Sequence, residues 1–427
     1  MHSISPCALA RLCTFIPVLL LASASSIAAA ADERPLAFGD ALQIAEHRSA
    51  RISAQEAAVG AAAEQIPRAT ELPDPKLRFG LDNVPVSNPD AFSLTRDFMT
   101  MRRIGYMQDM PNAHKRRARG ERAQREQQVE VANLGAQRAQ LRQDAAVAWL
   151  DTYYAERNLQ ALEQLAKALR LEAETTSPAV AGGRMPPAMA VAARVAVESV
   201  QDRVLAERRN LARARATLAA FVGDAAERPL GAAPDIDSLV HAPATLIAGI
   251  EAHADQRVFE EKEALAASEV ALAASTRKPD WNWEISFGQR EPRFSNMVSV
   301  MVSMDLPLRK SARQDRDVAT RLKQLDQVRA QREDARRMHE AEVRMLAADW
   351  TYAGERAARF EKNVLPLTRE RAELALAAYR GGRGELSTVL EARRAETEVE
   401  LSRLAAELDR ARAWARLNYL LGHEVKP

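Results

Sequence analysis

Methionine is the side chain whose placement in this sequence most suggests chemistry. Seven of the twelve methionines fall in two short segments, and these are Met99, Met101, Met107, Met110, Met297, Met301 and Met304. Thioether sulfur is a soft ligand that selects Cu(I) over harder ions. Methionine also fills irregular apolar walls without binding anything. The clustering alone therefore leaves both a soft-metal contact and simple packing open.

No arrangement of residues typical of an enzyme accompanies the methionines. Histidines spaced four apart would share one helix face, but none are so spaced among His47, His114, His241, His253, His339 and His423. No glycine-rich loop has the spacing that cradles a phosphate. The two cysteines, Cys7 and Cys13, lie near the start of the chain. We therefore expect no catalytic activity, no cofactor and no resident metal.

The composition points to long helices and excludes two classes of protein. The chain carries 60 Lys and Arg against 58 Asp and Glu, a formal net charge of +2, which argues against a nucleic-acid-binding protein. The mean hydropathy is −0.32 and no apolar run reaches 18 residues, which argues against a bundle of membrane helices. A membrane β-barrel stays open, because its strands alternate and carry a weak hydropathy signal.

The first 31 residues resemble an export signal. Arg11 ends a mildly basic region, Phe15 to Leu21 form a short apolar core, and Ala28 to Ala30 supply a small-residue cleavage site. We expect cleavage after Ala30 or Ala31. Cys13 precedes the apolar core, which argues against a lipoprotein. We therefore expect the protein to be exported to the envelope of a bacterium.

The remainder of the chain is a tandem repeat. Four markers recur in the same order at offsets of 199 to 206 residues. They are Pro73 with Pro279, Trp149 with Trp350, Gly182 with Gly381, and Gly223 with Gly422. We divide the chain into a signal peptide (1–31), a first repeat (32–223), a linker (224–243) and a second repeat (244–427).

Each repeat should contain a helix, a β-hairpin, a very long helix, a glycine turn and a return helix. The hairpins are expected at 76–110 and 281–306, and the turns at 182–184 and 381–384. Residues 112–177 contain no proline, and as one helix they would extend roughly 100 Å. The second long helix should run from about Leu308 to Arg380, with a kink at Pro366.

Coiled-coil spacing of small and branched apolar residues indicates that these helices pack side by side. The residues with that spacing are Leu159, Leu162, Ala166 and Leu169 in the first repeat and Leu401, Leu404, Leu408 and Ala411 in the second. The fold class is therefore mainly α, with a small β part.

The hairpin of the second repeat alternates apolar and polar residues over about 9 to 11 positions, the length that a tilted strand needs to cross a bilayer. If it does so, the apolar set faces lipid and the polar set faces a lumen. The lipid-facing set is Trp281, Trp283, Ile285 and Phe287, and the lumen-facing set is Asn282, Glu284, Ser286, Met297 and Met301. A soluble antiparallel sheet with one wet face would show the same alternation.

Strand counting then favours an assembly of several chains. Four strands cannot close a barrel, and an open sheet edge in lipid would leave backbone groups unpaired. Two chains would give eight strands, whose interior side chains fill. Three chains would give twelve strands with room for an aqueous lumen, and the long helices would continue it as a tube.

Three motifs carry a resemblance to a known family. They are Leu72-Pro73-Asp74-Pro75 before the first strand, Asp305-Leu306-Pro307-Leu308 after the fourth, and the run from Gly384 to Ala392 at the second turn. With the repeat plan, they make residues Leu36 to Glu424 similar to the TolC-like outer-membrane efflux proteins. The first hairpin, from Asn83 to Arg103, is most similar to the heavy-metal branch with CzcC- and CusC-like members. Met185-Pro186-Pro187 departs from the Ser/Thr-containing turn usual in the family.

The resemblance implies a trimeric channel-tunnel in the outer membrane, with a 12-stranded barrel and a coiled-coil tube that extends into the periplasm. It also implies a periplasmic adaptor and an inner-membrane resistance-nodulation-division pump as partners, and passive export of heavy-metal ions such as copper, silver, cobalt, zinc or cadmium. The adaptor-docking turns would be Gly182, Gly183, Arg184, Gly381, Gly382, Arg383 and Gly384. The alternatives are a periplasmic coiled-coil adaptor or scaffold, and a TolC-like channel for drugs or type I secretion.

Overall fold

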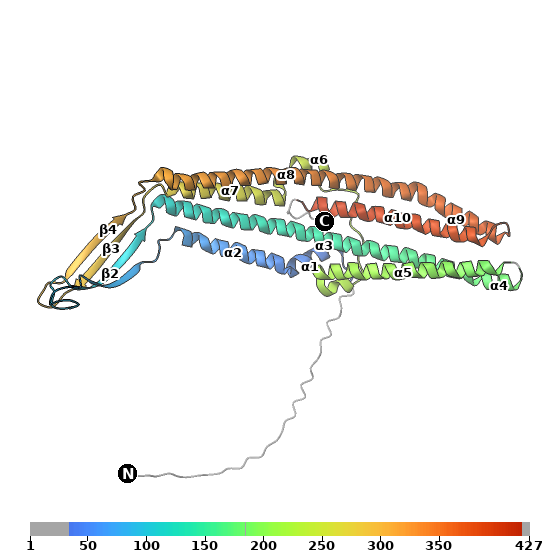
Figure 1. The fold of residues 1–427 in the computed structure, drawn as a ribbon. Helices are drawn as coiled ribbons and strands as arrows, with labels where there is room; N and C mark the ends of the chain where they lie inside the picture. Colours follow the sequence, from blue (N-terminus) through green and yellow to red (C-terminus); the bar gives the residue numbers. More distant parts are fainter. Residues whose placement is uncertain (1–33, 184, 421–427) are drawn as a thin grey trace, which may run out of the picture.

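The computed structural model describes residues 34–183 and 185–420, so the expected signal peptide and Arg184 lie outside the described residues. The molecule is long and narrow, with the strands at one end and parallel helices along the rest of its length (Figure 1). The first half contains α1 (Phe38–Arg48), α2 (Ala50–Thr70), β1 (Lys76–Asp82), β2 (Met101–Met110), α3 (Ala113–Glu174), α4 (Thr176–Ala181), α5 (Pro187–Val222) and η1 (Gly223–Glu227).

The second half repeats this order. It contains α6 (Pro243–Ala248), η2 (Ile250–Ala252), α7 (Ala254–Ser275), β3 (Trp281–Gln289), β4 (Met297–Met304), η3 (Lys310–Ala312), α8 (Gln314–Arg359), the π-helical turn η4 (Phe360–Val364), α9 (Leu365–Arg380) and α10 (Leu386–Asn418). The helix expected before each hairpin is divided in both halves, at Ser49 and around His253.

Helix α3 sets the length of the molecule. Its 62 residues contain no proline, and at 1.5 Å per residue they extend about 93 Å. The side chain of Asn112 caps its first turn by accepting a hydrogen bond from the backbone N–H of Lys115 at 2.9 Å. The helix ends at Glu174, where Thr175 separates it from α4.

The second long helix differs from the expectation in two details. It begins at Gln314 rather than near Leu308, because the chain first turns away from β4 through η3. It is also interrupted by the π-helical turn η4, which ends two residues before Pro366. Proline has no N–H to donate to the preceding turn, so the widened turn lies where the kink was expected.

The largest buried cluster lies near the middle of the molecule and contains an equivalent tryptophan contact from each half of the chain. The indole N–H of Trp149 donates to the carbonyl of Leu36 at 3.2 Å, and that of Trp350 donates to the carbonyl of Ile236 at 3.0 Å. Both the tryptophans and their acceptors are therefore one repeat apart in the sequence. Phe38 packs edge-on against Trp149, with ring centroids 5.5 Å apart, and completes the centre of this core.

A second buried cluster joins α3, α5 and α10 towards the glycine turns. Leu162, Ala166 and Leu169 are buried in it, as the coiled-coil spacing predicts, while Leu159 and Leu401 are partly buried at its edge. Leu404, Leu408 and Ala411 instead contribute to the central cluster. In the described part of the chain, no helix combines the length and the apolar composition needed to cross a membrane.

Candidate membrane sheet and helical turns

The two hairpins form one antiparallel sheet in the order β1-β2-β3-β4. Strands β2 and β3, from different repeats, pair over nine residues from Arg102–Gln289 to Met110–Trp281. This leaves β1 and β4 as edges within one chain. Strand β4 pairs only with β3 among the described residues, and all eight of its residues are exposed.

One face of the sheet is almost entirely apolar and exposed. The cross-strand register puts Trp281, Trp283, Ile285 and Phe287 on this face, where the alternation of β3 placed them together. Neighbouring strands continue it with Leu77, Phe79, Leu81, Ile104, Tyr106, Val298, Val300 and Val302. Most of these side chains are exposed, Phe79 to 74% and Val300 to 69%. An apolar surface of this extent marks an interaction with lipid or with another protein.

The other face is polar and contains the rest of the predicted strand set. Residues opposite each other in an antiparallel pair point to the same side, so Met297 and Met301 share this face with Asn282, Glu284 and Ser286. Glu284 and Ser286 are buried at 8% and 4% exposure. Glu284 leans across Gly105, where a side chain would lie 2.9 Å from its Oε1 atom. A glycine at that position gives the carboxylate its space.

The methionines divide between the two faces, and the sequence had assigned Met297 and Met301 to the polar one. Met101, Met107, Met297 and Met301 belong to the polar face, whereas Met110 and Met304 flank Trp281 on the apolar face. Met107 and Met301 lie opposite Glu284 on its two neighbouring strands. This puts two thioethers beside one carboxylate in a single row across the sheet.

Asp280 fixes the junction between the sheet and the helices. It accepts hydrogen bonds from the backbone N–H and the side-chain Nδ2 of Asn112, at 2.9 and 3.0 Å, and it pairs with Lys115. Burial alone would raise the pKa of Asp280, but the hydrogen bonds from Lys115 and Asn112 lower it below its usual value of 3.8. The start of β3 is therefore tied to the start of α3. The sequence showed Asp280 only as part of a repeated Pro-Asp pair.

The two glycine turns lie at the end opposite the sheet, beside α4 and α9 (Figure 1). Gly183 and Gly382 have φ angles of 67° and 69°, a region that side chains disfavour. After α9, the N–H of Gly382 donates to the carbonyl of Tyr379, and the N–H of Arg383 donates to that of Ala378. This is the Schellman pattern of a helix C-terminus.

After the first glycine turn, the chain enters its return helix, α5, at two prolines. Pro186 is the N-cap of α5 and Pro187 its first residue, where a missing N–H costs nothing. Gly182 and Gly381 have ordinary negative φ angles. The left-handed residue is therefore the second glycine of each pair, and a side chain at that position would strain the turn.

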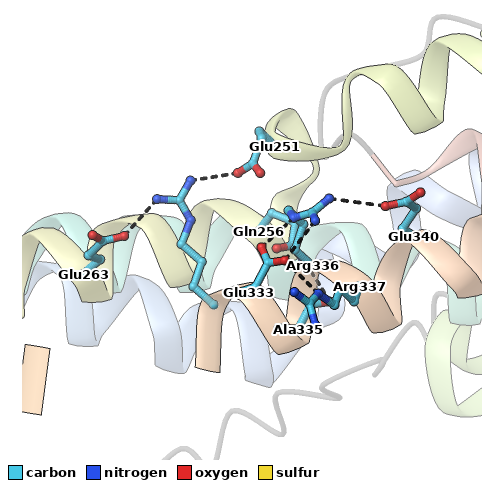
Figure 2. A network of polar contacts seen from close by, with 9 residues as sticks. Glu251, Gln256, Glu263, Glu333, Ala335, Arg336, Arg337 and Glu340 are labelled. Atoms are coloured by element: carbon cyan, nitrogen blue, oxygen red, sulfur yellow. Dashed lines mark hydrogen bonds and ion pairs between the residues drawn. The ribbon is translucent and has the colours of Figure 1, made fainter. Parts of the chain in front are cut away.

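Charged side chains join α7 to α8 midway between the sheet and the turns. Arg332 bridges Glu251 and Glu263, at 2.8 and 3.0 Å, and hydrogen bonds from Arg329 and Arg332 lower the pKa of Glu263. Figure 2 shows Glu333 facing Arg336 and Arg337 on α8, whose hydrogen bonds lower the pKa of Glu333 to about 2. Among the described residues, no three His, Cys, Asp or Glu side chains gather as a metal site.

Solved structures of outer-membrane channels have this fold. The chain matches the outer membrane protein VceC of Vibrio cholerae over 91% of its length and 97% of that chain, with a TM-score of 0.73 and 16% identity. The CmeC outer membrane channel of Campylobacter jejuni matches over 90% and 85%, with a TM-score of 0.76 and 11% identity. CusC, a protein that forms a transmembrane channel, matches over 91% and 92%, with a TM-score of 0.74 and 15% identity.

No protein-family profile and no curated protein sequence matches the chain. At identities of 11 to 16% the structural matches establish the fold, and they do so over nine-tenths of the chain. The chain has the TolC-like channel fold, mainly helical with a four-stranded sheet. The predicted fold class is thereby confirmed.

Proposed function

We propose that this protein is a non-enzymatic outer-membrane channel, a trimer that conducts exported substrate from a periplasmic pump and adaptor to the cell exterior. One observation carries the proposal: the sheet is apolar on one exposed face, polar on the other, and open at both edges within one chain. Lipid would cover the apolar face, and water would fill a lumen against the polar face. The fold shared with solved outer-membrane channels supports the same role.

The two open edges determine how many chains are needed. Pairing β4 of one chain with β1 of the next would satisfy the backbone groups that an open edge leaves unpaired in lipid. Three chains of four strands give a closed sheet of twelve, wide enough for a water-filled lumen. The helices of roughly 90 Å would then continue this lumen into the periplasm.

Single cysteines on β3 and its neighbour β4 test the two faces. With the purified protein in lipid vesicles, a water-soluble thiol reagent should label cysteines at Asn282 of β3 and Ser299 of β4, and not those at Trp283 and Ile285. Native mass measurement in detergent should give three chains. Uniform labelling of β3, or release of the protein from membranes by high salt, would instead support the alternative of a periplasmic adaptor or scaffold.

We assign adaptor docking to the glycine turns. Their support is position: they lie at the end of the molecule away from the sheet, where a periplasmic partner would meet the channel (Figure 1). The proposed set is Gly182, Gly183, Arg184, Gly381, Gly382, Arg383 and Gly384. Arg383→Glu reverses a charge without straining the turn, since the positive φ belongs to Gly382.

The docking test compares Arg383→Glu with a control within α3, far from the turn. Gly135→Ala is a suitable control, because nothing lies within 4 Å of the added carbon. Arg383→Glu should abolish export while trimer level stays normal, and Gly135→Ala should export as the parent does. If Arg383→Glu assembles normally and exports fully, this turn is not the adaptor-docking site.

For the substrate we propose heavy-metal ions, including monovalent copper or silver. The support is the resemblance of the first hairpin to the heavy-metal branch, together with the row of Met107, Glu284 and Met301 on the polar face. Thioethers are soft ligands, and an exit channel should not hold its ion tightly; the Glu284 carboxylate is already paired with Arg78. The fold itself does not identify the substrate.

Deletion of the gene distinguishes the substrate classes. In a strain without a second channel of this fold, loss of the protein should sensitise cells to copper, silver, zinc, cobalt or cadmium more than to dyes and detergents. Greater sensitivity to dyes and detergents would favour the alternative of a drug channel, and loss of a secreted protein would favour type I secretion.

A further inference from the structure

The charges on the polar face of the sheet all occur as ion pairs. Three cations and three anions occupy this face in one chain, and they pair one to one. The pairs are Lys76–Asp109 at 2.7 Å, Arg78–Glu284 at 3.0 Å and Arg103–Asp82 at 2.7 Å. The other polar positions on β3 and β4 are Asn282, Ser286, Ser299 and Ser303, which carry no charge. The polar face is therefore electrically neutral.

The Arg78–Glu284 pair is the one that makes this balance complete. The polar side of β1 and β2 carries three cations and two anions, whereas that of β3 and β4 carries only Glu284. Each hairpin alone would leave one charge unpaired, of opposite sign in the two repeats. Arg78 reaches Glu284 across the intervening strand β2, over the space that Gly105 leaves open.

We propose that these ion pairs keep the strand section of the channel non-selective for charge, and that Arg78–Glu284 is the pair that balances the charge of one hairpin against that of the other. The inference rests on the proposed channel function and on the polar face lining the lumen. A neutral wall neither collects counter-ions nor repels substrate of either sign. An unpaired charge would be repeated three times around the lumen, and such a ring raises the local concentration of the opposite ion.

Reversal potentials across a planar lipid bilayer test this directly. The purified trimer is measured in a KCl gradient at low ionic strength, where fixed charges are least screened. Arg78→Gln leaves Glu284 unpaired and should shift the permeability towards K⁺, while Glu284→Gln should shift it towards Cl⁻. A change in local potential worth about one RT per unit charge raises the permeability of one ion and lowers that of the other. The ratio of K⁺ to Cl⁻ permeability then changes roughly sevenfold.

Two neighbouring arginines of β2 give a matched control. Arg103 lies on the polar face and pairs with Asp82, whereas Arg102 lies on the apolar face opposite Leu81 and Gln289. Arg103→Gln should shift selectivity towards K⁺, and Arg102→Gln should leave it at the parent value. Charges on the helices are the same in all variants, so each comparison isolates the sheet.

The double variant Arg78→Gln/Glu284→Gln removes both members of the pair and should restore the parent selectivity. Unchanged reversal potentials in both single variants, or shifts in the same direction, would overturn the inference. Equal shifts from Arg102→Gln and Arg103→Gln would overturn it as well. A parent protein that forms trimers but conducts no ions would instead refute the proposed channel function.

Discussion

Acidification should destabilise the protein through a buried histidine pair between α7 and α8. His253 is 1% exposed, and its Nδ1 lies 2.8 Å from Nε2 of His339. Burial and the neighbouring imidazole lower the pKa of His253 from 6.5 to about 4. The unfolded chain therefore binds a proton that the folded chain excludes, and stability is lost as the pH falls from 6.5 towards 4. At about pH 5 the loss from this one group comes to about 2 kcal/mol.

Nearby carboxyl groups act on the same measurement. Burial raises the pKa of Asp255, so this group contributes stability as the pH falls, opposite in sign to His253. Glu342 lies 3.3 Å from Nδ1 of His339, on the other side of the pair. A variant that lacks His253 but keeps Asp255 and Glu342 separates the effect of the histidine on stability from the effects of these two carboxyl groups.

His253→Gln is that variant, because it retains a polar side chain but does not titrate. Thermal unfolding of the detergent-solubilised trimer would be followed between about pH 7.5 and pH 5, where the two proteins should diverge by about 2 kcal/mol. The parent should lose stability faster than the variant. Parallel loss in the two proteins would show that His253 is accessible to protons in the folded state and would refute the argument.

Three further predictions concern the sheet, its junction and the core. Val300→Lys on the apolar face should cost about 2–4 kcal/mol of membrane stability and reduce trimer yield on gels, whereas Ser299→Lys on the polar face should not. Asp280→Asn should lower the unfolding temperature near neutral pH; the deficit should shrink in acid, because the lowered pKa of Asp280 means that its stabilisation is lost there. Trp149→Phe should cost about 1 kcal/mol in chemical denaturation, since it removes a buried hydrogen-bond donor; no loss would show that water replaces the indole.

Local rules were enough to predict the elements that matter most to the fold. Strand β3 begins at Trp281, as predicted. An unbroken alternation of apolar and polar residues is typical of a strand with one buried face. The length of α3 followed from the absence of proline over residues 112–177. The left-handed glycines followed from the need to reverse the chain within a few residues.

Contacts between distant segments could not be predicted in the same way. Arg78 and Glu284 are 206 residues apart, and they meet only because β2 and β3 pair in one register. A shift of that register by one residue would move every side chain to the opposite face. The same dependence applies to the methionines and to the His253–His339 pair, 86 residues apart. Such contacts depend on pairing and packing that no single segment encodes.

The two hairpins differ in charge although the two halves of the chain share a contact in the core. In the core, both repeats keep the same contact, a tryptophan that donates to a backbone carbonyl 113 residues earlier in the first repeat and 114 residues earlier in the second. In the sheet they have diverged: the first hairpin keeps one excess cation on its polar face, and the second keeps one excess anion. A ring of first hairpins alone would carry a net positive charge, and a ring of second hairpins a net negative one. Only alternation of the two, with Arg78 of one against Glu284 of the other, cancels the charge. The neutral face therefore requires both repeats in one chain, and it gives a physical reason for them to remain different.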